Sequence, residues 1–461
     1  MASLSTSESD AALAAVSPQD LAQRLGRAIQ FQTISYEDPA QFDHDAFTGL
    51  HQYLEAAFPG VHAALTRETV GRYSLLYTWQ GQDPALPPVV MLGHLDVVPI
   101  EPGTEGEWAC PPFGGLVDGG FVWGRGALDM KSAVLGVLEA AEALLATGFC
   151  PRRSVLFAFG EDEEVGGWNG AVQLVALLRA RGIQPEYVLD EGLTISEGIV
   201  PIVRRPVAMI GIAEKGLRSL ELSVEVSGGH SSMPPRETAI GILSTAIARL
   251  ERHQMPLRLG GPALQTMARL AGEMPPAMRL IVANRRLFGP LLTRMLASAP
   301  SGAATVRTTT APTIFQAGVK ENVLASRARA VVNFRLLPGD TFASLIDHVR
   351  RTVSDPRVRV VETGAFRSDP SPVSDTVSLG FQTIERAIVQ VYPGVAVAPG
   401  LVLVASDSRH YAQQGCPCYR FSPLWMRPED LSRIHGVNER IGVDHYARAV
   451  QFYTQLIRAS A

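Results

Sequence analysis

The stretch SVLFAFGEDEE, from Ser154 to Glu164, joins an uninterrupted apolar run to four consecutive acidic residues. The apolar run has the length and composition of a strand buried on both faces, as in sheets covered by helices. Open sheets of this kind bind ligands at the carboxyl ends of their strands. Four anions at the end of a buried strand are unfavourable unless a cation compensates them. The stretch therefore indicates an α/β fold and leaves two alternatives for the four acidic residues, a metal site at this strand end or a solvated acidic patch.

Strands and helices alternate on both sides of this stretch. Residue patterns predict strands at 89–92, 154–159 and 187–189, and helices at 131–146 and 171–179. A first helix is expected after Ser17 as N-cap and Pro18. Residues 1 to about 16 are expected to form a loose terminus. This rhythm predicts a sheet with helices on both faces.

The pattern changes near Glu214 and predicts a second domain inserted into the first. Strands are expected at 207–213, 217–226, 328–336 and 357–361, with helices at 238–252 and 342–353. This set is typical of a small α+β open-faced sandwich. The first pattern resumes with helices at 377–391 and 444–458. We therefore predict a main domain of residues 1–214 and 364–461 and an inserted domain of residues 215–363. Residues 254–308, rich in Leu, Met, Pro and Arg, fit neither pattern.

The composition is that of a soluble globular protein. A chain of 461 residues is long enough for two domains. The net charge of -4 gives no electrostatic footprint for nucleic acid. No apolar run reaches the ~18 residues of a membrane span. The N-terminus lacks the basic and apolar parts of a signal peptide, which favours a cytoplasmic protein.

Further metal-ligand types follow other predicted strands. His94 and Asp96 come directly after the strand at 89–92, and side chains two apart in extended chain face the same side. Asp96 can therefore hold the His94 imidazole, as a metal-bound histidine requires. Asp129 opens the helix at 131–146 after a glycine-rich stretch, where a plain helix cap is the alternative.

Asp190 follows the strand at 187–189, and His435 lies in a loop far along the chain. Each alone is compatible with a structural or surface role. Together, two histidines and several carboxylates form the mixed nitrogen and oxygen ligand set that suits zinc. No Gly-x-Ser-x-Gly motif is present, so a serine hydrolase has no nucleophile elbow to start from.

Five motifs resemble the M20 metallopeptidase family in order and approximate spacing: GHLDVVP (93–99), GRGALDMK (124–131), EDEE (161–164), LDEG (189–192) and IHGVNE (434–439). Three longer stretches resemble its carboxypeptidase S-like branch, which includes N-fatty-acyl-amino-acid hydrolases: residues 229–243, 307–323 and 427–439. The resemblance implies a zinc-exopeptidase-like catalytic domain for residues 1–214 and 364–461. It also implies that the inserted domain serves as a lid and a dimerisation surface, so a homodimer is expected.

The resemblance further implies the roles of the site residues. His94 and Asp190 would bind one zinc ion, and Glu164 and His435 the other, with Asp129 bridging both; cobalt or manganese are alternatives to zinc. Glu163 would be the general base and Asp96 the residue that orients His94. Adjacent Glu163 and Glu164 can point apart, one to the water and one to the metal.

Four more residues complete the predicted site. His230, in the turn after the strand at 217–226, would reach an active site, often that of the dimer partner; a plain turn histidine is the alternative. Arg335 lies in an otherwise apolar strand, where an unpaired charge is costly, and a bidentate grip on a substrate carboxylate would explain it. Asp407 and Arg409 match a loop that lines the site in this family.

These features predict a two-zinc enzyme that cleaves or forms the amide bond of N-acyl amino acids with a free carboxylate. A carboxypeptidase or dipeptidase acting on short peptides is the alternative. A non-catalytic homologue is a further alternative. The intact Glu163 and ligand set argue against it. The apolar residues of the stretch 255–300 would form either a helical hairpin packed on its own domain or part of a groove for a long acyl chain.

Overall fold

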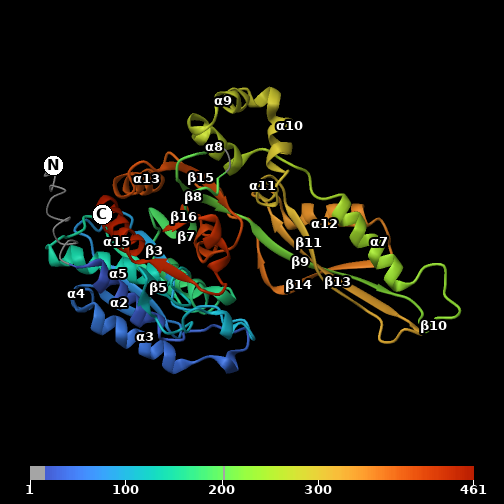
Figure 1. Cartoon of the computed structure of the whole chain (residues 1–461), viewed down its shortest axis with the longest axis horizontal. Helices are drawn as coiled ribbons and strands as arrows, with labels where there is room; N and C mark the ends of the chain where they lie inside the picture. Colours follow the sequence, from blue (N-terminus) through green and yellow to red (C-terminus); the bar gives the residue numbers. More distant parts are fainter. Residues whose placement is uncertain (1–15, 201–202) are drawn as a thin grey trace.

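A computed structural model describes residues 16–200 and 203–461 of the chain. The expected loose terminus lies almost entirely outside these residues. A larger domain, built from the two ends of the chain, carries a smaller domain that projects away from it (Figure 1). The predicted first helix is confirmed as α2 (Pro18–Ile29), and the side chain of Ser17 accepts a hydrogen bond from the amide of Asp20.

An eight-stranded sheet forms the centre of the larger domain. Its strand order is β1-β2-β6-β3-β7-β16-β8-β15. The pairs β3–β6, β3–β7, β7–β16 and β8–β15 are parallel, whereas β1–β2 and β2–β6 are antiparallel. In that order the strands span Thr66–Val70, Ser74–Trp79, Val155–Gly160, Val89–His94, Tyr187–Ser196, Cys418–Met426, Val207–Glu214 and Ala396–Val402.

Helices cover both faces of this sheet, as predicted. Tyr77, Met91 and Phe157 point to one face and belong to a core with helices α2, α5 (Lys131–Ala146), α13 (Leu379–Val391) and α15 (Val443–Ser460). Val90 and Leu156, one residue out of phase, point to the other face and pack with α6 (Ala171–Ala180) and α14 (Ser408–Ala412). Because alternate residues of each strand serve opposite cores, these strands are apolar throughout.

Smaller elements border this eight-stranded sheet, which we call the catalytic sheet because the predicted catalytic residues follow its strands. Helices α3 (His44–Ala57) and α4 (Pro59–Ala64) follow α2 in the chain. A three-stranded sheet joins β4 (Val117–Asp118), β5 (Phe121–Trp123) and β17 (Arg440–Gly442). Short 3-10 turns span Pro39–Gln41 (η1), Glu105–Glu107 (η2), Glu163–Val165 (η3), Ala271–Glu273 (η4) and Pro428–Arg433 (η5).

The inserted domain is an antiparallel four-stranded sheet with helices on one face. The strand order is β11-β13-β9-β14, with bounds Thr309–Ala317, Arg327–Leu336, Gly216–Glu225 and Val358–Ser368. Helices α7 (Ala239–Arg252) and α12 (Phe342–Val353) pack against Phe334, Leu336 and other alternate residues of the strands. The residues between these alternate positions point to the other face of the sheet. A two-stranded ribbon, β10 (Gly229–His230) with β12 (Val323–Leu324), extends the domain.

Two short crossings connect the domains. The first runs from Glu214 into Gly216, and the second follows β14, which continues past the predicted boundary at residue 363 to Ser368. The crossings are joined, since the Glu214 amide donates to Ser371 Oγ at 2.9 Å. Gly216 is required here, because a Cβ atom at this position would lie 2.6 Å from the backbone nitrogen of Pro370.

The unassigned stretch 254–308 forms four helices, α8 (Gly261–Leu270), α9 (Pro276–Ala283), α10 (Arg285–Leu296) and α11 (Pro300–Val306). Met267, Leu270 and Leu292 pack with residues of β8 and β15 at the edge of the catalytic sheet. The expectation of a helical hairpin packed on its own domain is therefore wrong, because its apolar side covers the neighbouring domain. Among the described helices, none is both long and apolar enough to cross a membrane.

Candidate metal centre

The candidate site gathers at the carboxyl ends of three neighbouring strands. His94 is the last residue of β3, Glu163 and Glu164 follow β6, and Glu191 lies in β7. Because β6, β3 and β7 are adjacent in the sheet, their ends meet at one place. Asp129 is added by the loop before α5, and His435 by the loop between η5 and β17.

Asp129 lies between the two histidines. Its Oδ1 is 3.0 Å from His94 Nε2, and its Oδ2 is 3.0 Å from His435 Nε2. Glu191 Oε1 lies 3.4 Å from His94 Nε2, and Glu164 Oε1 lies 3.2 Å from His435 Nε2. The arrangement is thus two groups of one histidine and one glutamate that share the carboxylate of Asp129.

The charge balance of these residues fits divalent cations. Burial raises the pKa of Glu191 well above its ordinary value, and the nearby Asp129 raises it further. Burial and then Asp129 likewise raise the pKa of Glu164, whose Oε1 faces His435. Hydrogen bonds to Asp129 and Glu164 raise the pKa of His435 to about 10. Clustered carboxylates with two imidazoles are the ligand set of a metal pair.

Asp96, fully buried, holds the site in shape. Its Oδ1 lies 3.3 Å from His94 Nδ1, which leaves Nε2 of that ring free to face Asp129. The same carboxylate accepts hydrogen bonds from the amides of Glu163 at 3.1 Å and Glu164 at 3.2 Å. The predicted partnership of Asp96 with His94 is thus present in the geometry, and Asp96 also fixes the turn after β6.

The structure places Asp190 differently from the predicted role. Asp190 Oδ2 accepts the amide of Ser408 at 2.6 Å, and Oδ1 accepts the amide of Glu191 at 2.8 Å. Its neighbour Glu191 approaches His94 instead. In a strand, adjacent side chains face opposite sides, so only one of the two can point into the site. Glu191 is therefore a site residue that the sequence analysis missed, although it stands in the quoted LDEG motif.

A second missed residue, Glu439, supports the loop that carries Asp129. Its fully buried carboxylate accepts the amides of Gly126 at 3.0 Å, Leu128 at 2.7 Å and Asp129 at 3.2 Å. It also pairs with Arg125 at 2.7 Å, and Arg125 donates to the carbonyl of His435 at 3.0 Å. The pair ties together the two loops that present Asp129 and His435. Glu439 is the last residue of the motif IHGVNE, so the motif itself contained the signal that could have identified it.

The four consecutive acids divide into two pairs. Glu161 accepts hydrogen bonds from the Arg72 side chain at 3.0 Å and from the amide of Tyr73. Asp162 accepts the amides of Asn169 and Gly170, both at 2.8 Å. These two acids hold neighbouring loops, which leaves Glu163 and Glu164 for the site.

Comparison with known proteins identifies the family. The profile described as Peptidase family M20/M25/M40 matches residues 90–459. The chain belongs to peptidase family M20. An M20 enzyme is a metal-dependent hydrolase of amide bonds, and the cluster around Asp129 is the candidate site for metal ions in this chain.

Individual M20 relatives are similar over nearly the whole chain. The N-fatty-acyl-amino acid synthase/hydrolase PM20D1.1 of Danio rerio is 43% identical over 441 residues, which cover 94% of this chain and 84% of the relative. The probable carboxypeptidase S-like 2 of Dictyostelium discoideum is 41% identical over 443 residues, covering 95% and 85%. The M20 family metallo-carboxypeptidase Sso-CP2 from Sulfolobus solfataricus shares the fold with a TM-score of 0.68, at 17% identity, over 95% of this chain and 98% of that one.

Glu163 lies next to the ligand cluster of this M20 chain. Burial raises its pKa well above the ordinary value, and the charges of Glu191 and Asp407 raise it further. The guanidinium of Arg409 is 3.7 Å from its Oε1 and is held by the carbonyls of Ser406 and Gly166. Asp407 and Arg409, predicted to line the site, therefore lie beside Glu163.

Arg335 and His230 both belong to the inserted domain. In β13 the side chains of Phe334 and Leu336 face the helices, so Arg335 between them lies on the open face of the sheet. Burial lowers its pKa, and it makes no salt bridge to a described residue. His230 is exposed in β10, at the end of the domain farthest from the catalytic sheet (Figure 1). The structure does not bring His230 to the metal cluster of its own chain.

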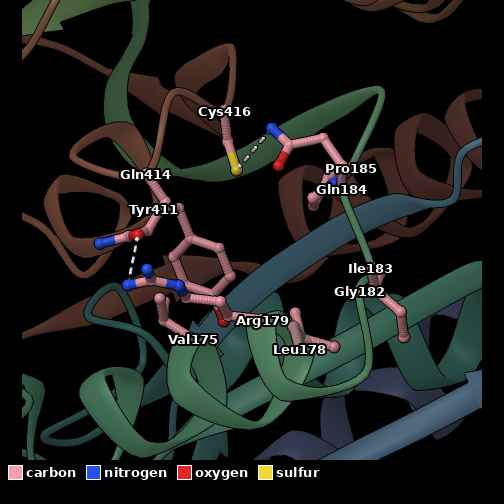
Figure 2. Close-up of a pocket in the computed structure, with 10 residues that line it drawn as sticks. All are labelled: Val175, Leu178, Arg179, Gly182, Ile183, Gln184, Pro185, Tyr411, Gln414 and Cys416. Atoms are coloured by element: carbon pink, nitrogen blue, oxygen red, sulfur yellow. Dashed lines mark hydrogen bonds between the residues drawn. The ribbon is translucent and has the colours of Figure 1, made fainter.

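A separate cavity of about 360 Å³ lies between α6 and the segment that follows α14. Figure 2 shows Val175 and Leu178 on its floor, with Tyr411 and Cys416 above them. Gln184 donates a hydrogen bond to Cys416 Sγ at 3.6 Å across it. None of the predicted site residues lines this cavity, so it is distinct from the candidate metal centre.

Proposed function

We propose that this M20 enzyme binds two zinc ions, with cobalt or manganese as alternatives, and hydrolyses or forms the amide bond of N-acyl amino acids. The observation that carries the proposal is Asp129, whose two oxygens each lie 3.0 Å from a different histidine. His94 and Glu191 would hold one ion, and His435 and Glu164 the other, with Asp129 shared. Glu191 replaces Asp190 in this assignment because the oxygens of Asp190 accept two backbone amides.

A bound metal pair would supply Lewis acidity to the scissile carbonyl and lower the pKa of the attacking water. Glu163 would take the proton of that water and pass it to the leaving nitrogen. Its raised pKa suits this task, because a carboxylate must be basic enough to accept a proton near neutral pH. The guanidinium of Arg409, 3.7 Å away, would favour the ionised form of Glu163 between proton transfers.

Arg335 would bind the carboxylate of the amino-acid part of the substrate. It is half-buried, carries no salt bridge to a described residue and lies on the open face of its sheet. A guanidinium in such a place binds a carboxylate through two parallel hydrogen bonds. His230, remote from its own metal cluster, would act in the site of a dimer partner and stabilise the developing oxyanion. The expected cytoplasmic location stays a prediction.

The acyl group is the part of the substrate that separates the two candidate activities. The Danio rerio relative is named for N-fatty-acyl amino acids and the Dictyostelium discoideum relative for carboxypeptidase activity, at similar identity. We take the N-acyl amino acid as the substrate because of the likeness to the Danio rerio relative, which is 43% identical over 441 residues, and keep the short peptide as the alternative. Long apolar chains are the form we propose.

The test compares kcat/KM for N-acyl-phenylalanines from acetyl to oleoyl with kcat/KM for dipeptides. Each buried methylene contributes about 0.8 kcal/mol at most, so kcat/KM should rise up to about fourfold per methylene while the chain fits. Arg335→Ala should lower kcat/KM for the whole series, and amidation of the substrate carboxylate should abolish the difference between wild type and variant. A flat series, or faster cleavage of dipeptides, would favour the peptidase activity instead.

A further inference from the structure

Helices α9 and α10 expose apolar side chains at the outer edge of the molecule. Leu280, Leu287, Leu291 and Met295 are 64%, 75%, 46% and 41% exposed. In Figure 1 the two helices stand clear of both sheets (yellow). Large exposed leucines gathered on one helical pair are unusual on a monomeric soluble surface and indicate an interaction site.

Three of the exposed residues form one stripe. Leu287, Leu291 and Met295 are spaced by four residues in α10, so they lie along the same side of the helix. Leu292, on a different side, is buried in the cluster that packs on β8 and β15. The helix is thus buried on one side in this cluster, which also contains residues of α8 and α9, and presents a second apolar side outward.

The segment that carries the stripe is positively charged. No Asp or Glu occurs between Met274 and Lys320, although the whole chain has a net charge of -4. Arg285, Arg286 and Arg294 are exposed on α10 and form no salt bridge with any residue of the described ranges. A protein partner of mixed charge would leave this one-sided distribution unexplained, whereas an anionic layer would match all of it.

We propose that α9 and α10 dock on an anionic lipid bilayer surface. The leucine and methionine side chains would enter the acyl boundary, and the three arginines would pair with lipid phosphates and carboxylates. The mode is that of an amphipathic helix lying in the interface, and it requires no spanning segment. This inference does not depend on the proposed substrate, because it concerns binding and not turnover.

The experiment is co-sedimentation of the full chain with vesicles of phosphatidylcholine alone and of phosphatidylcholine with about one third phosphatidylserine. We expect binding to the anionic vesicles that weakens as salt is added. The variant Leu287→Ser/Leu291→Ser and the variant Arg285→Glu/Arg286→Glu should each lower the partition coefficient about tenfold or more. Matched controls are Val377→Ser, at another site 73% exposed, and Arg359→Glu on the exposed side of β14; both should bind as the wild type does.

The changed side chains are exposed, so each variant should fold as the wild type does. Circular dichroism and thermal unfolding check this and exclude misfolding as the cause of weaker binding. Equal binding to neutral and anionic vesicles, or unchanged binding by the α10 variants, would overturn the proposal. So would a change of oligomeric state in the Leu287→Ser/Leu291→Ser variant without vesicle binding by the wild type, because the stripe would then be a protein interface.

Discussion

Glu163 and Glu164 are neighbours in the chain but face different parts of the site. The Asp96 carboxylate binds the amides of both, which fixes the turn after β6. Glu164 then approaches His435 and Glu163 approaches Arg409. The opposite orientations of these two identical side chains therefore depend on one buried aspartate.

Glu163→Gln should remove turnover and retain the metal. The substitution keeps the size of the side chain and takes away the proton acceptor, so kcat should fall by about 10²–10⁴-fold. Metal content, measured by mass spectrometry of the purified protein, should equal that of the wild type. Glu164→Gln is the matched control and should lose metal. The opposite result would mean that the two glutamates have exchanged roles.

Glu191→Gln should weaken metal binding more than Asp190→Asn does. Glu191 approaches His94, whereas Asp190 supports the backbone of its neighbours, and loss of such a supporting contact costs about 10–100-fold in metal affinity. Competition with a chromophoric chelator measures both affinities. A larger loss in Asp190→Asn would restore Asp190 as the ligand.

At the scale of elements, α3 carries a histidine that is buried without a partner for one ring nitrogen. His51 is 8% exposed, its ring contacts Tyr73 edge-on, and its Nε2 has no hydrogen-bond partner among the described residues. Burial and the nearby charge of Arg67 lower the pKa of His51 to about 4. In the unfolded chain the same histidine takes up its proton near pH 6.5.

The free energy of unfolding should therefore fall as the pH drops from 6.5 towards 4. In this window the unfolded state binds a proton that the folded state refuses, so the group's contribution is present above pH 6.5 and is lost on acidification. The loss amounts to roughly 3 kcal/mol at most. Urea unfolding of the metal-free protein at several pH values measures it.

His51→Phe should reduce this acid sensitivity, while His253→Gln, on the exposed end of α7, should leave it unchanged. Part of the fall in the free energy of unfolding with decreasing pH should remain, because burial also lowers the pKa of His410 to about 4. An identical slope in wild type and His51→Phe would show that His51 does not titrate in this window.

At the scale of the whole molecule, the insertion separates parts that we propose to work together. The open face of the inserted sheet carries Arg335, next to the crossing at Gly216. His230 lies at the other end of the same sheet, on the ribbon β10–β12. If both residues contact substrate, we expect Arg335 to act in the active site of its own chain and His230 in that of a partner.

Mixing two inactive variants tests this arrangement. His230→Ala and Glu163→Gln should each be inactive alone, and exchange of subunits should restore up to about one quarter of wild-type activity, since half of the dimers are mixed and each has one intact site. Subunit exchange is monitored by fluorescence energy transfer between labelled chains. Exchange without recovery would place His230 outside the partner's site. A homodimer itself is checked by light scattering.

The sequence alone determined several strands and helices around the candidate metal site and most of the residues that meet there. The prediction of a helix at 131–146 agrees with α5 residue by residue, because its apolar periodicity and its flanking loops are local properties. His94, Asp129, Glu164 and His435 meet as the motifs indicated. The ends of adjacent parallel strands meet at one edge, so His94 and Glu164 converge without further information, whereas Asp129 and His435 are brought there by loops.

Only the tertiary structure decided between neighbours and between domains. Asp190 and Glu191 are equivalent in composition and pattern, and the register of β7 against β16 and the amide of Ser408 fix which one faces His94. The stretch 254–308 has an ordinary apolar pattern, yet its helix α8 packs in one cluster with residues of β8 and β15 of the other domain. Periodicity tells which side of an element is buried, but the surface that buries it is set by contacts between residues distant in the chain.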